Sequence, residues 1–138
     1  MTRTSALGLI VALGALPMAV AAIQAPPVGP TNPAALAVTG IEKVKDNLYV
    51  ITGSSPAPRE TFSGGNVGVF VTDRGVVVVD TKLAGWGPTI LERIRTVTDK
   101  PVVTIINTHT HGDHTGSNEF FGATVESVVQ ENTKANMA

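Results

Sequence analysis

The chain has 138 residues, with 10 Lys and Arg, 11 Asp and Glu, 3 His and no Cys, so its formal net charge is −1 at pH 7. These numbers are typical of one ordinary soluble domain and exclude a disulfide framework, a thiol nucleophile and a Cys-ligated zinc finger. Because the charge is near zero and only 4% of the residues are aromatic, the composition also argues against a nucleic-acid-binding protein.

The first 21 residues follow the order of features found in a secretory signal peptide. Arg3 gives a positive charge, residues 6–16 form an uncharged and mostly apolar run, and a small-x-small signal, Ala-Val-Ala, ends at Ala21. The apolar run is too short for a helix that spans roughly 30 Å of hydrocarbon. We therefore expect residues 1–21 to be a signal peptide, rather than a buried helix or a membrane anchor, with cleavage after Ala21 or, as second choice, after Ala25. The mature protein is then periplasmic or secreted and is not held in a membrane.

A proline-rich segment follows the predicted signal peptide. Residues 22–38 contain four prolines, at positions 26, 27, 30 and 33, a spacing that we expect to prevent both helix and sheet. This segment is therefore predicted to be an extended linker, and residues 39–138 are predicted to form the folded domain.

Two β-hairpins are predicted in the first half of this domain. Turn residues at positions 45–47 (Lys-Asp-Asn) and 73–75 (Asp-Arg-Gly) separate the apolar runs within each hairpin. The expected strands are residues 40–44 and 48–52, then 66–72 and 76–81, with a loop over residues 53–65 between the hairpins. Because residues 76–79 are four consecutive valines, we expect this strand to be buried on both faces of the sheet.

The second half of the domain alternates helix and strand. Apolar residues at positions 90, 91, 94 and 97 predict an amphipathic helix over residues 87–98, with Pro88 in its first turn. The strands on either side of this helix should be parallel. The remaining expected elements are a strand over 102–107, a polar loop over 108–116, a short helix over 117–121, a strand over 123–129 and a helix over 131–137. The pattern predicts the α/β (α+β) class, with a mixed β-sheet and flanking helices.

All three histidines of the chain lie within one hexapeptide, His109-Thr110-His111-Gly112-Asp113-His114. Neutral imidazole is the commonest protein ligand for zinc, and a carboxylate is a usual partner. If strand geometry continues to His111, the side chains of His109 and His111 point to one face and can meet one metal ion. Gly112 is expected to let the backbone turn sharply, so that Asp113 and His114 face a second metal ion nearby. The alternative is a solvated polar turn with incidental histidines.

The hexapeptide comes directly after a predicted buried strand, and it resembles the His-x-His-x-Asp-His signature of the metallo-β-lactamase superfamily. The resemblance covers roughly residues 40–138. It implies that His109 and His111 bind one zinc ion and that Asp113 and His114 bind the other, so that the complete enzyme holds two zinc ions. The signature is specific for the superfamily and weak for the substrate.

Asp80 follows the four-valine strand and matches an earlier acidic motif of the same superfamily. The resemblance implies that this carboxylate supports the metal loop by hydrogen bonding from behind the ligands. The alternative is that Asp80 caps a helix or a turn. Thr115 and Ser117, which could be taken for nucleophiles, are expected to cap the short helix that follows them.

The chain departs from the family pattern in its length and in its number of histidines. Family members are usually much longer and supply further metal ligands after this loop, whereas this chain has no histidine after His114. The family fold is an αββα sandwich of two sheets between helical layers, and the resemblance implies that this chain holds about its first half. One sheet would then lack its partner, so we expect an exposed apolar face and a tendency to self-associate.

These observations predict a zinc-dependent hydrolase, in which metal-bound hydroxide attacks a carbonyl-type substrate such as a β-lactam, a lactone or a thioester. Asp113 is the candidate catalytic residue, because it is placed to orient the hydroxide and to receive its proton. The loop gives each ion only two protein ligands, below the three of a catalytic zinc site, so the chain alone is expected to be weakly active or inactive. Two alternatives stay open, a secreted zinc-binding half-domain without turnover and a half that needs a second chain to complete its site. The expected partner is a small-molecule substrate and not a nucleic acid.

Overall fold

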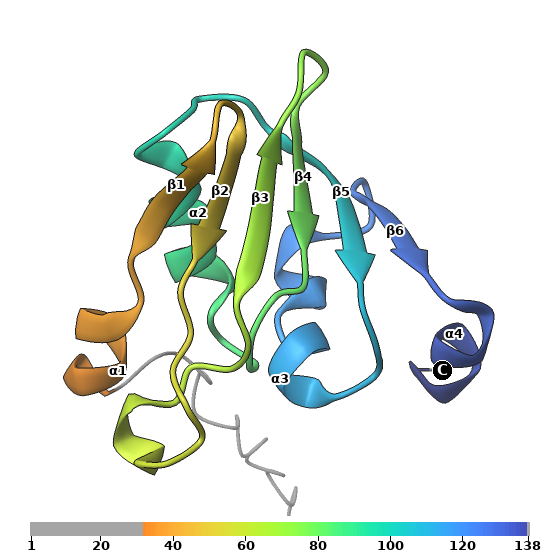
Figure 1. Ribbon diagram of the computed structural model, residues 1–138. Helices are drawn as coiled ribbons and strands as arrows, with labels where there is room; N and C mark the ends of the chain where they lie inside the picture. Colours follow the sequence, from red (N-terminus) through yellow and green to blue (C-terminus); the bar gives the residue numbers. More distant parts are fainter. Residues whose placement is uncertain (1–31, 138) are drawn as a thin grey trace, which may run out of the picture.

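The computed structural model describes residues 32–137, so the predicted signal peptide and residues 22–31 of the predicted linker lie outside the described residues. A six-stranded β-sheet with the order β1-β2-β3-β4-β5-β6 forms the centre of the molecule (Figure 1). The strands are β1 (Ile41–Lys45), β2 (Leu48–Ile51), β3 (Val67–Val71), β4 (Val76–Val79), β5 (Val102–Asn107) and β6 (Glu126–Val129). The helices are α1 (Pro33–Val38), α2 (Gly87–Arg95), α3 (Gly112–Thr115) and α4 (Glu131–Met137), and 3-10 turns lie at η1 (Arg59–Thr61) and η2 (Asn118–Phe121).

The sheet is mixed, as the sequence predicted. The two hairpins, β1–β2 and β3–β4, are antiparallel, and so is the β2–β3 pair that joins them. The strands on either side of α2, β4 and β5, are parallel, and β6 continues the parallel pairing. The predicted mixed sheet with flanking helices is therefore confirmed. Parallel pairing also brings the carboxyl ends of β4 and β5 to the same edge of the sheet.

Helix α1 occupies residues 33–38, so the prediction of an extended linker as far as residue 38 is wrong for this part. Pro33 lies in the first turn, where its missing N–H costs no helical hydrogen bond. The side chain of Asn32 caps the helix by accepting a hydrogen bond from the backbone N–H of Ala34. Ala35 is buried against the domain core. Proline disrupts the interior of a helix but is favourable in its first turn, and Pro33 occupies the first turn of α1.

Helix α2 covers one face of the sheet and lies behind β1 and β2 in the view of Figure 1. It begins at Gly87 with Pro88 in its first turn, as predicted, and ends at Arg95, somewhat earlier than predicted. Ile90 and Ile94 are fully buried in the same cluster as the inward-facing valines of β3 and β4. Since burial of a side chain of this size contributes roughly 1.5–3 kcal/mol, this layer is a main source of stability.

The four-valine strand β4 is fully buried on one face only. Val76 and Val78 have no exposed surface, whereas Val77 and Val79 are half-buried. The prediction that β4 is buried on both faces is therefore wrong. Within residues 32–137, no second layer covers the outer face of the sheet. An unbroken apolar run cannot distinguish a strand with two covered faces from a strand with one.

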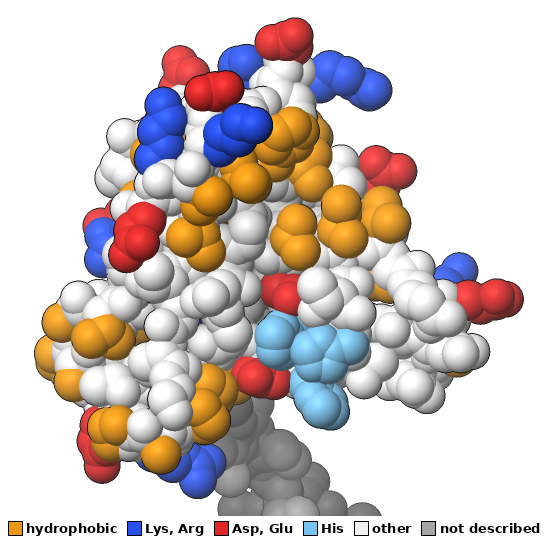
Figure 2. Space-filling model, in the orientation of Figure 1, with side chains coloured by type: hydrophobic (Ala, Val, Ile, Leu, Met, Phe, Trp, Pro, Cys, Tyr) orange, Lys and Arg blue, Asp and Glu red, His pale blue; other side chains and the backbone are white. Residues whose placement is uncertain are grey.

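Apolar side chains form a continuous surface on the uncovered face of the sheet. Strand register places Phe70 between residues of β2 and β4, and Ile106 between residues of β4 and β6. We call this surface the open apolar face; it comprises Leu48, Phe70, Val77, Val79, Ile106 and Val128. Its most exposed members are 37–44% exposed, and Figure 2 shows it above the histidines. The expected exposed apolar face is thus present, while its association with a partner stays a prediction.

The elements after α2 largely follow the prediction. β5 and α4 have the predicted bounds, whereas β6 begins only at Glu126. The prediction of a polar loop over residues 108–116 is wrong for residues 112–115, which form α3. The prediction that Thr115 and Ser117 cap the turn after them is wrong. Ser117 Oγ accepts hydrogen bonds from the backbone N–H groups of Trp86 and Gly87, at the start of α2, and Thr115 Oγ1 donates back to the carbonyl oxygen of His111. None of the helices among residues 32–137 is long and apolar enough to cross a membrane.

Candidate metal centre

The histidine hexapeptide begins in the turn after the carboxyl end of β5, and its last three residues, 112–114, lie in α3. Because β4 is the parallel neighbour of β5, Asp80, which follows the last residue of β4, meets this turn. The backbone N–H of Asp80 donates to the carbonyl oxygen of Ile106 at 2.9 Å, which extends the parallel pairing by one residue. In open α/β sheets, ligands bind outside the carboxyl ends of the parallel strands. The hexapeptide and Asp80 occupy such a position.

The three histidine side chains lie together at the protein surface. The ring centroids of His109 and His111 are 4.7 Å apart, and those of His109 and His114 are 4.1 Å apart. Asp113 lies beside them, with its Oδ2 3.5 Å from Nε2 of His114. Figure 2 shows the histidines as one cluster, next to acidic side chains. All the residues predicted to be metal ligands are therefore in one place.

Asp80 is buried behind this cluster and is fully engaged in hydrogen bonds to the loop. Its Oδ1 accepts from the backbone N–H of Thr108 at 2.8 Å, and its Oδ2 accepts from the hydroxyl of Thr108 at 2.8 Å. Oδ2 also lies 2.7 Å from Nδ1 of His114. The side chain of Asp80 is only 6% exposed, so these contacts are shielded from water. The carboxylate therefore holds the loop at Thr108, before the hexapeptide, and at His114, its last residue. Its role towards a metal ion stays a prediction.

These hydrogen bonds define which nitrogen of each ring is free to bind a metal. An ionised carboxylate only accepts, so Nδ1 of His114 carries the proton and its Nε2 presents a lone pair. The hydroxyl of Thr108 donates to Asp80, so it accepts from Nδ1 of His109 at 2.9 Å, and Nε2 of His109 is free as well. A partner on one ring nitrogen is what orients the other towards a metal ion.

The donor atoms fit a divalent cation of the zinc type. With these tautomers, Nε2 of His114 and Oδ2 of Asp113 are both lone-pair donors that face each other at 3.5 Å. A nearby cation stabilises such a pair, and imidazole nitrogen with carboxylate oxygen is a donor set that zinc uses. Among residues 32–137, however, no three His, Asp or Glu side chains are arranged to hold a single ion together. The loop as it stands offers fewer ligands to one ion than the three of a catalytic zinc site.

Residues 80–82 form a strained backbone segment beneath the loop. The N–H of Thr81 donates to the carbonyl oxygen of His114 at 2.7 Å, and the carbonyl oxygen of Lys82 accepts from the N–H of Gly116 at 2.9 Å. Asp80 and Lys82 have φ angles of 64° and 61°, in the left-handed region. This region costs roughly 1–2 kcal/mol for a residue with a side chain. Strain held in place by surrounding contacts is a feature of functional sites.

Gly112 does not make the sharp turn that the sequence suggested. It is the first residue of α3, and its φ is not among the positive glycine values of the described residues. A Cβ at this position would meet no atom within 4 Å. The change of direction is made by His111, whose extended backbone (φ −64°, ψ 140°) directly precedes the helix.

Gly65 contacts the metal loop directly, a role that the sequence analysis did not assign to this glycine. Its N–H donates to the carbonyl oxygen of Asp113 at 3.0 Å. A Cβ on Gly65 would lie 2.5 Å from Cε1 of His114, so only a glycine allows this approach. A Cβ on Gly64, whose φ is 102°, would lie 2.6 Å from the carbonyl oxygen of Asp113. The glycine pair therefore forms one wall of the candidate site.

Lys82 is a second residue that the sequence did not reveal, since lysine is rarely buried. Its side chain is fully buried, and its Nζ donates to the carbonyl oxygens of Thr52 and Gly65, each at 2.8 Å, and to Oγ of Ser63 at 3.1 Å. Burial lowers the pKa of Lys82 to about 8, so the ammonium form still predominates at pH 7.

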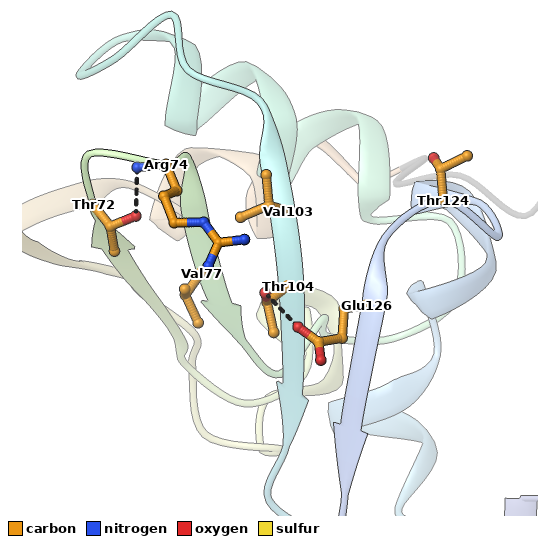
Figure 3. A pocket seen from close by; sticks show the side chains of 7 residues that line it. All are labelled: Thr72, Arg74, Val77, Val103, Thr104, Thr124 and Glu126. Atoms are coloured by element: carbon orange, nitrogen blue, oxygen red, sulfur yellow. Dashed lines mark hydrogen bonds between the residues drawn. The ribbon is translucent and has the colours of Figure 1, made fainter.

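A separate pocket lies at the opposite end of the parallel strands. It has a volume of about 370 Å³. Its lining residues, shown in Figure 3, are Thr72, Arg74, Val77, Val103, Thr104, Thr124 and Glu126. The Thr104 hydroxyl donates to Glu126 across it at 3.3 Å. None of the histidines lines this pocket, and it lies at the amino ends of β4 and β5, away from the edge where ligands bind in such sheets.

Comparison with known proteins agrees with the histidine loop and the fold. A family model described as the metallo-beta-lactamase superfamily matches residues 61–126, which include Asp80 and the whole hexapeptide. The chain is therefore similar to the metallo-β-lactamase superfamily in this loop and in its fold. A curated relative, the metallo-beta-lactamase type 2 of Elizabethkingia meningoseptica, is 39% identical over 92 residues, which cover 59% of this chain and 32% of that protein.

Solved structures of this superfamily share the fold described above. The subclass B3 metallo-beta-lactamase BJP-1 of Bradyrhizobium japonicum has a TM-score of 0.56 at 26% identity, over 71% of this chain and 36% of its own. A metallo-beta-lactamase from Hirschia baltica has a TM-score of 0.58 at 22% identity, over 71% of this chain and 47% of its own. The sec-alkyl sulfatase PisA1, as a double mutant, has a TM-score of 0.53 at 20% identity, over 78% of this chain and 18% of its own. This metallo-β-lactamase-fold chain thus spans less than half the length of each of these relatives.

Proposed function

We propose that this chain carries the metal-binding loop of a secreted or periplasmic, zinc-dependent hydrolase. Similarity to the metallo-β-lactamase superfamily supports a metal-dependent hydrolase as the kind of enzyme. The observation that carries the proposal is a pair of hydrogen bonds: Nδ1 of His114 donates to Asp80, and Nδ1 of His109 donates to Thr108. Both bonds leave the Nε2 atom of the ring free beside Asp113. The secretory part of the proposal rests on the signal-peptide pattern of residues 1–21.

Each residue of the loop has a defined task in this proposal. His109 and His111 hold one zinc ion, and Asp113 and His114 hold the other. When bound, zinc would supply hydroxide at neutral pH, because it lowers the pKa of its bound water towards about 7. Asp113 is placed to orient the attacking hydroxide and to accept its proton, since its carboxylate is 32% exposed while that of Asp80 is shielded. Asp80 holds the imidazole of His114 in one orientation by accepting a hydrogen bond from its Nδ1.

The substrate class that we favour is a carbonyl compound, namely a β-lactam, a lactone or a thioester. Relatives described as metallo-beta-lactamases support a β-lactam, whereas a sulfatase shares the same fold. A common fold does not decide between these substrates, because substrate contacts come from the parts of a site that vary on one scaffold.

A zinc titration combined with hydrolysis assays tests the proposal. The purified chain should take up zinc with a saturable heat in calorimetry, because its free imidazole and carboxylate donors lie together. Hydrolysis of a cephalosporin, a lactone and a thioester is then measured with zinc present. Turnover of any one of them supports the hydrolase, and the absence of zinc uptake overturns the proposal.

A zinc-binding half-domain without turnover is the second candidate. It is favoured by one observation, that no three ligand side chains within the described residues converge on one ion. The same experiment separates the two functions, since zinc uptake without hydrolysis of any of the three compounds supports this candidate for the isolated chain.

We also propose that the open apolar face drives self-association with a second copy of the chain. The face joins apolar side chains of β2, β3, β4, β5 and β6, and such surfaces mark interaction sites. Analytical ultracentrifugation is expected to show a concentration-dependent dimer. Phe70→Glu should weaken the dimer by at least tenfold, because the charge would be buried without a partner. Val38→Glu is the matched control, since Val38 is 43% exposed on α1 and lies outside this face. A strictly monomeric wild type would refute the association.

A further inference from the structure

Lys82 links two loops that are far apart in the sequence. In the described part of the chain, no carboxylate lies within 4.0 Å of its ammonium, and its partners are three oxygens of residues 52–65. Hydrogen bonds from a charged donor are roughly twice as strong as neutral ones. A buried charge without a carboxylate partner is nevertheless costly. Burying an apolar side chain of similar length would cost less free energy than burying an ammonium. We therefore infer that the ammonium is retained because its hydrogen bonds hold these three oxygens in place.

We propose that Lys82 is a positioning residue for the metal loop, and that it acts by holding residues 63–65 against Asp113 and His114. The inference rests on the proposed function in one respect, because it assigns metal binding to these two side chains. It adds a residue whose hydrogen bonds go to other partners than Asp113 and His114.

A short series of contacts transmits this effect. Lys82 Nζ donates to the carbonyl oxygen of Gly65, and the N–H of Gly65 donates to the carbonyl oxygen of Asp113. The α-carbon of Gly65 lies against the imidazole of His114, since a Cβ there would be 3.0 Å from its Nε2. His114 is thereby held by Asp80 at Nδ1 and by Gly65 at the ring. Loss of the lysine should let residues 63–65 move away and free the ring on that side.

The substitution Lys82→Met tests the inference, because methionine fills the space but donates no hydrogen bond. Two quantities are measured, the zinc affinity by calorimetry and the amide hydrogen exchange of the metal-free chain by NMR. We expect zinc affinity to fall about tenfold, at the lower end of the range for residues that support metal ligands from behind. Exchange at the amides of Gly65, His114 and Gly116 should accelerate at least tenfold more than exchange at Val78 in the core.

The matched control is Lys100→Met. Lys100 donates through Nζ to the carbonyl oxygen of Thr72 at 2.8 Å, at the end of the sheet away from the histidines. A second control, Val76→Ala, destabilises the core by roughly 0.5–3 kcal/mol without touching the loop. Neither control should change zinc affinity or the exchange at Gly65 relative to the core. An equal effect in Lys82→Met and Val76→Ala would show a merely structural role and overturn the inference.

Ser63→Ala keeps the inference testable if Lys82→Met does not fold. It removes one of the three acceptors of Lys82 and leaves the buried lysine in place. Exchange at Gly65 and His114 should again accelerate more than exchange at Val78, and unchanged relative rates would overturn the inference. The exchange measurements need no metal. They therefore test whether Lys82 positions the loop even if the wild type takes up no zinc and the proposed function fails.

Discussion

Replacing His111 with alanine is expected to lower the zinc affinity of the chain by at least about 100-fold, beyond the range known for residues that only support ligands. His111 makes no side-chain capping bond at the start of α3, and it lies in an exposed part of the loop. Its removal therefore takes away a metal donor and little else. The free energy of unfolding of the metal-free chain should change by less than about 0.5 kcal/mol, as for other exposed positions. Calorimetry and urea unfolding of the same samples measure both quantities.

Thr110→Ala provides the control for this experiment. Thr110 lies between His109 and His111 and is half-buried, but it carries no donor that zinc prefers. It should bind zinc as the wild type does. Equal zinc affinity in His111→Ala and the wild type would show that His111 is no ligand. The assignment of two loop residues to each of two zinc ions would then be wrong.

Replacing Asp80 with alanine is expected to lower the free energy of unfolding by about 2–4 kcal/mol, because it leaves buried donors without a partner. These donors are the N–H and hydroxyl of Thr108 and Nδ1 of His114. Zinc affinity should also fall about 10–100-fold, since neither His109 nor His114 would be held in the tautomer that frees Nε2. Urea unfolding without metal and calorimetry with zinc measure the two effects.

Asp80→Asn separates these two effects. Asparagine keeps the size of the side chain and tolerates the left-handed backbone at φ 64°. It loses the negative charge that orders the donors around it, so zinc affinity should fall while much of the stability is retained. Asp73→Asn, in the exposed β3–β4 turn, is the control and should behave as wild type. Wild-type zinc affinity in Asp80→Asn would contradict the supporting role of this carboxylate.

Much of the fold could be predicted because its signals are local. The turns at residues 45–47 and 73–75 lie between strands that pair as hairpins, and the apolar spacing from Ile90 produces the helix that covers the sheet. The errors have local causes too. Pro33 is unfavourable inside a helix but favourable at its start, and the four valines of β4 have the same pattern whether their outer face is covered or open.

The candidate site was predicted only in part. His109, His111, Asp113 and His114 are neighbours in the sequence, so their spacing alone suggested that they act together. Gly65 and Lys82 gave no such signal. A glycine before a strand resembles any turn, and a lysine after a strand is normally exposed. Their contact with the loop arises from the packing of residues 52–65 against the end of β4.

By itself, the sequence determined the order of the strands, the helix α2 and the histidine hexapeptide, because side-chain period and residue spacing act over a few neighbouring positions. Only the tertiary structure decided that Asp80 orients two imidazoles, that Gly65 forms a wall against His114, and that an ammonium is buried behind them. These contacts join residues many positions apart. They depend on how parallel strands align at their carboxyl ends, which the residue pattern within one strand does not specify.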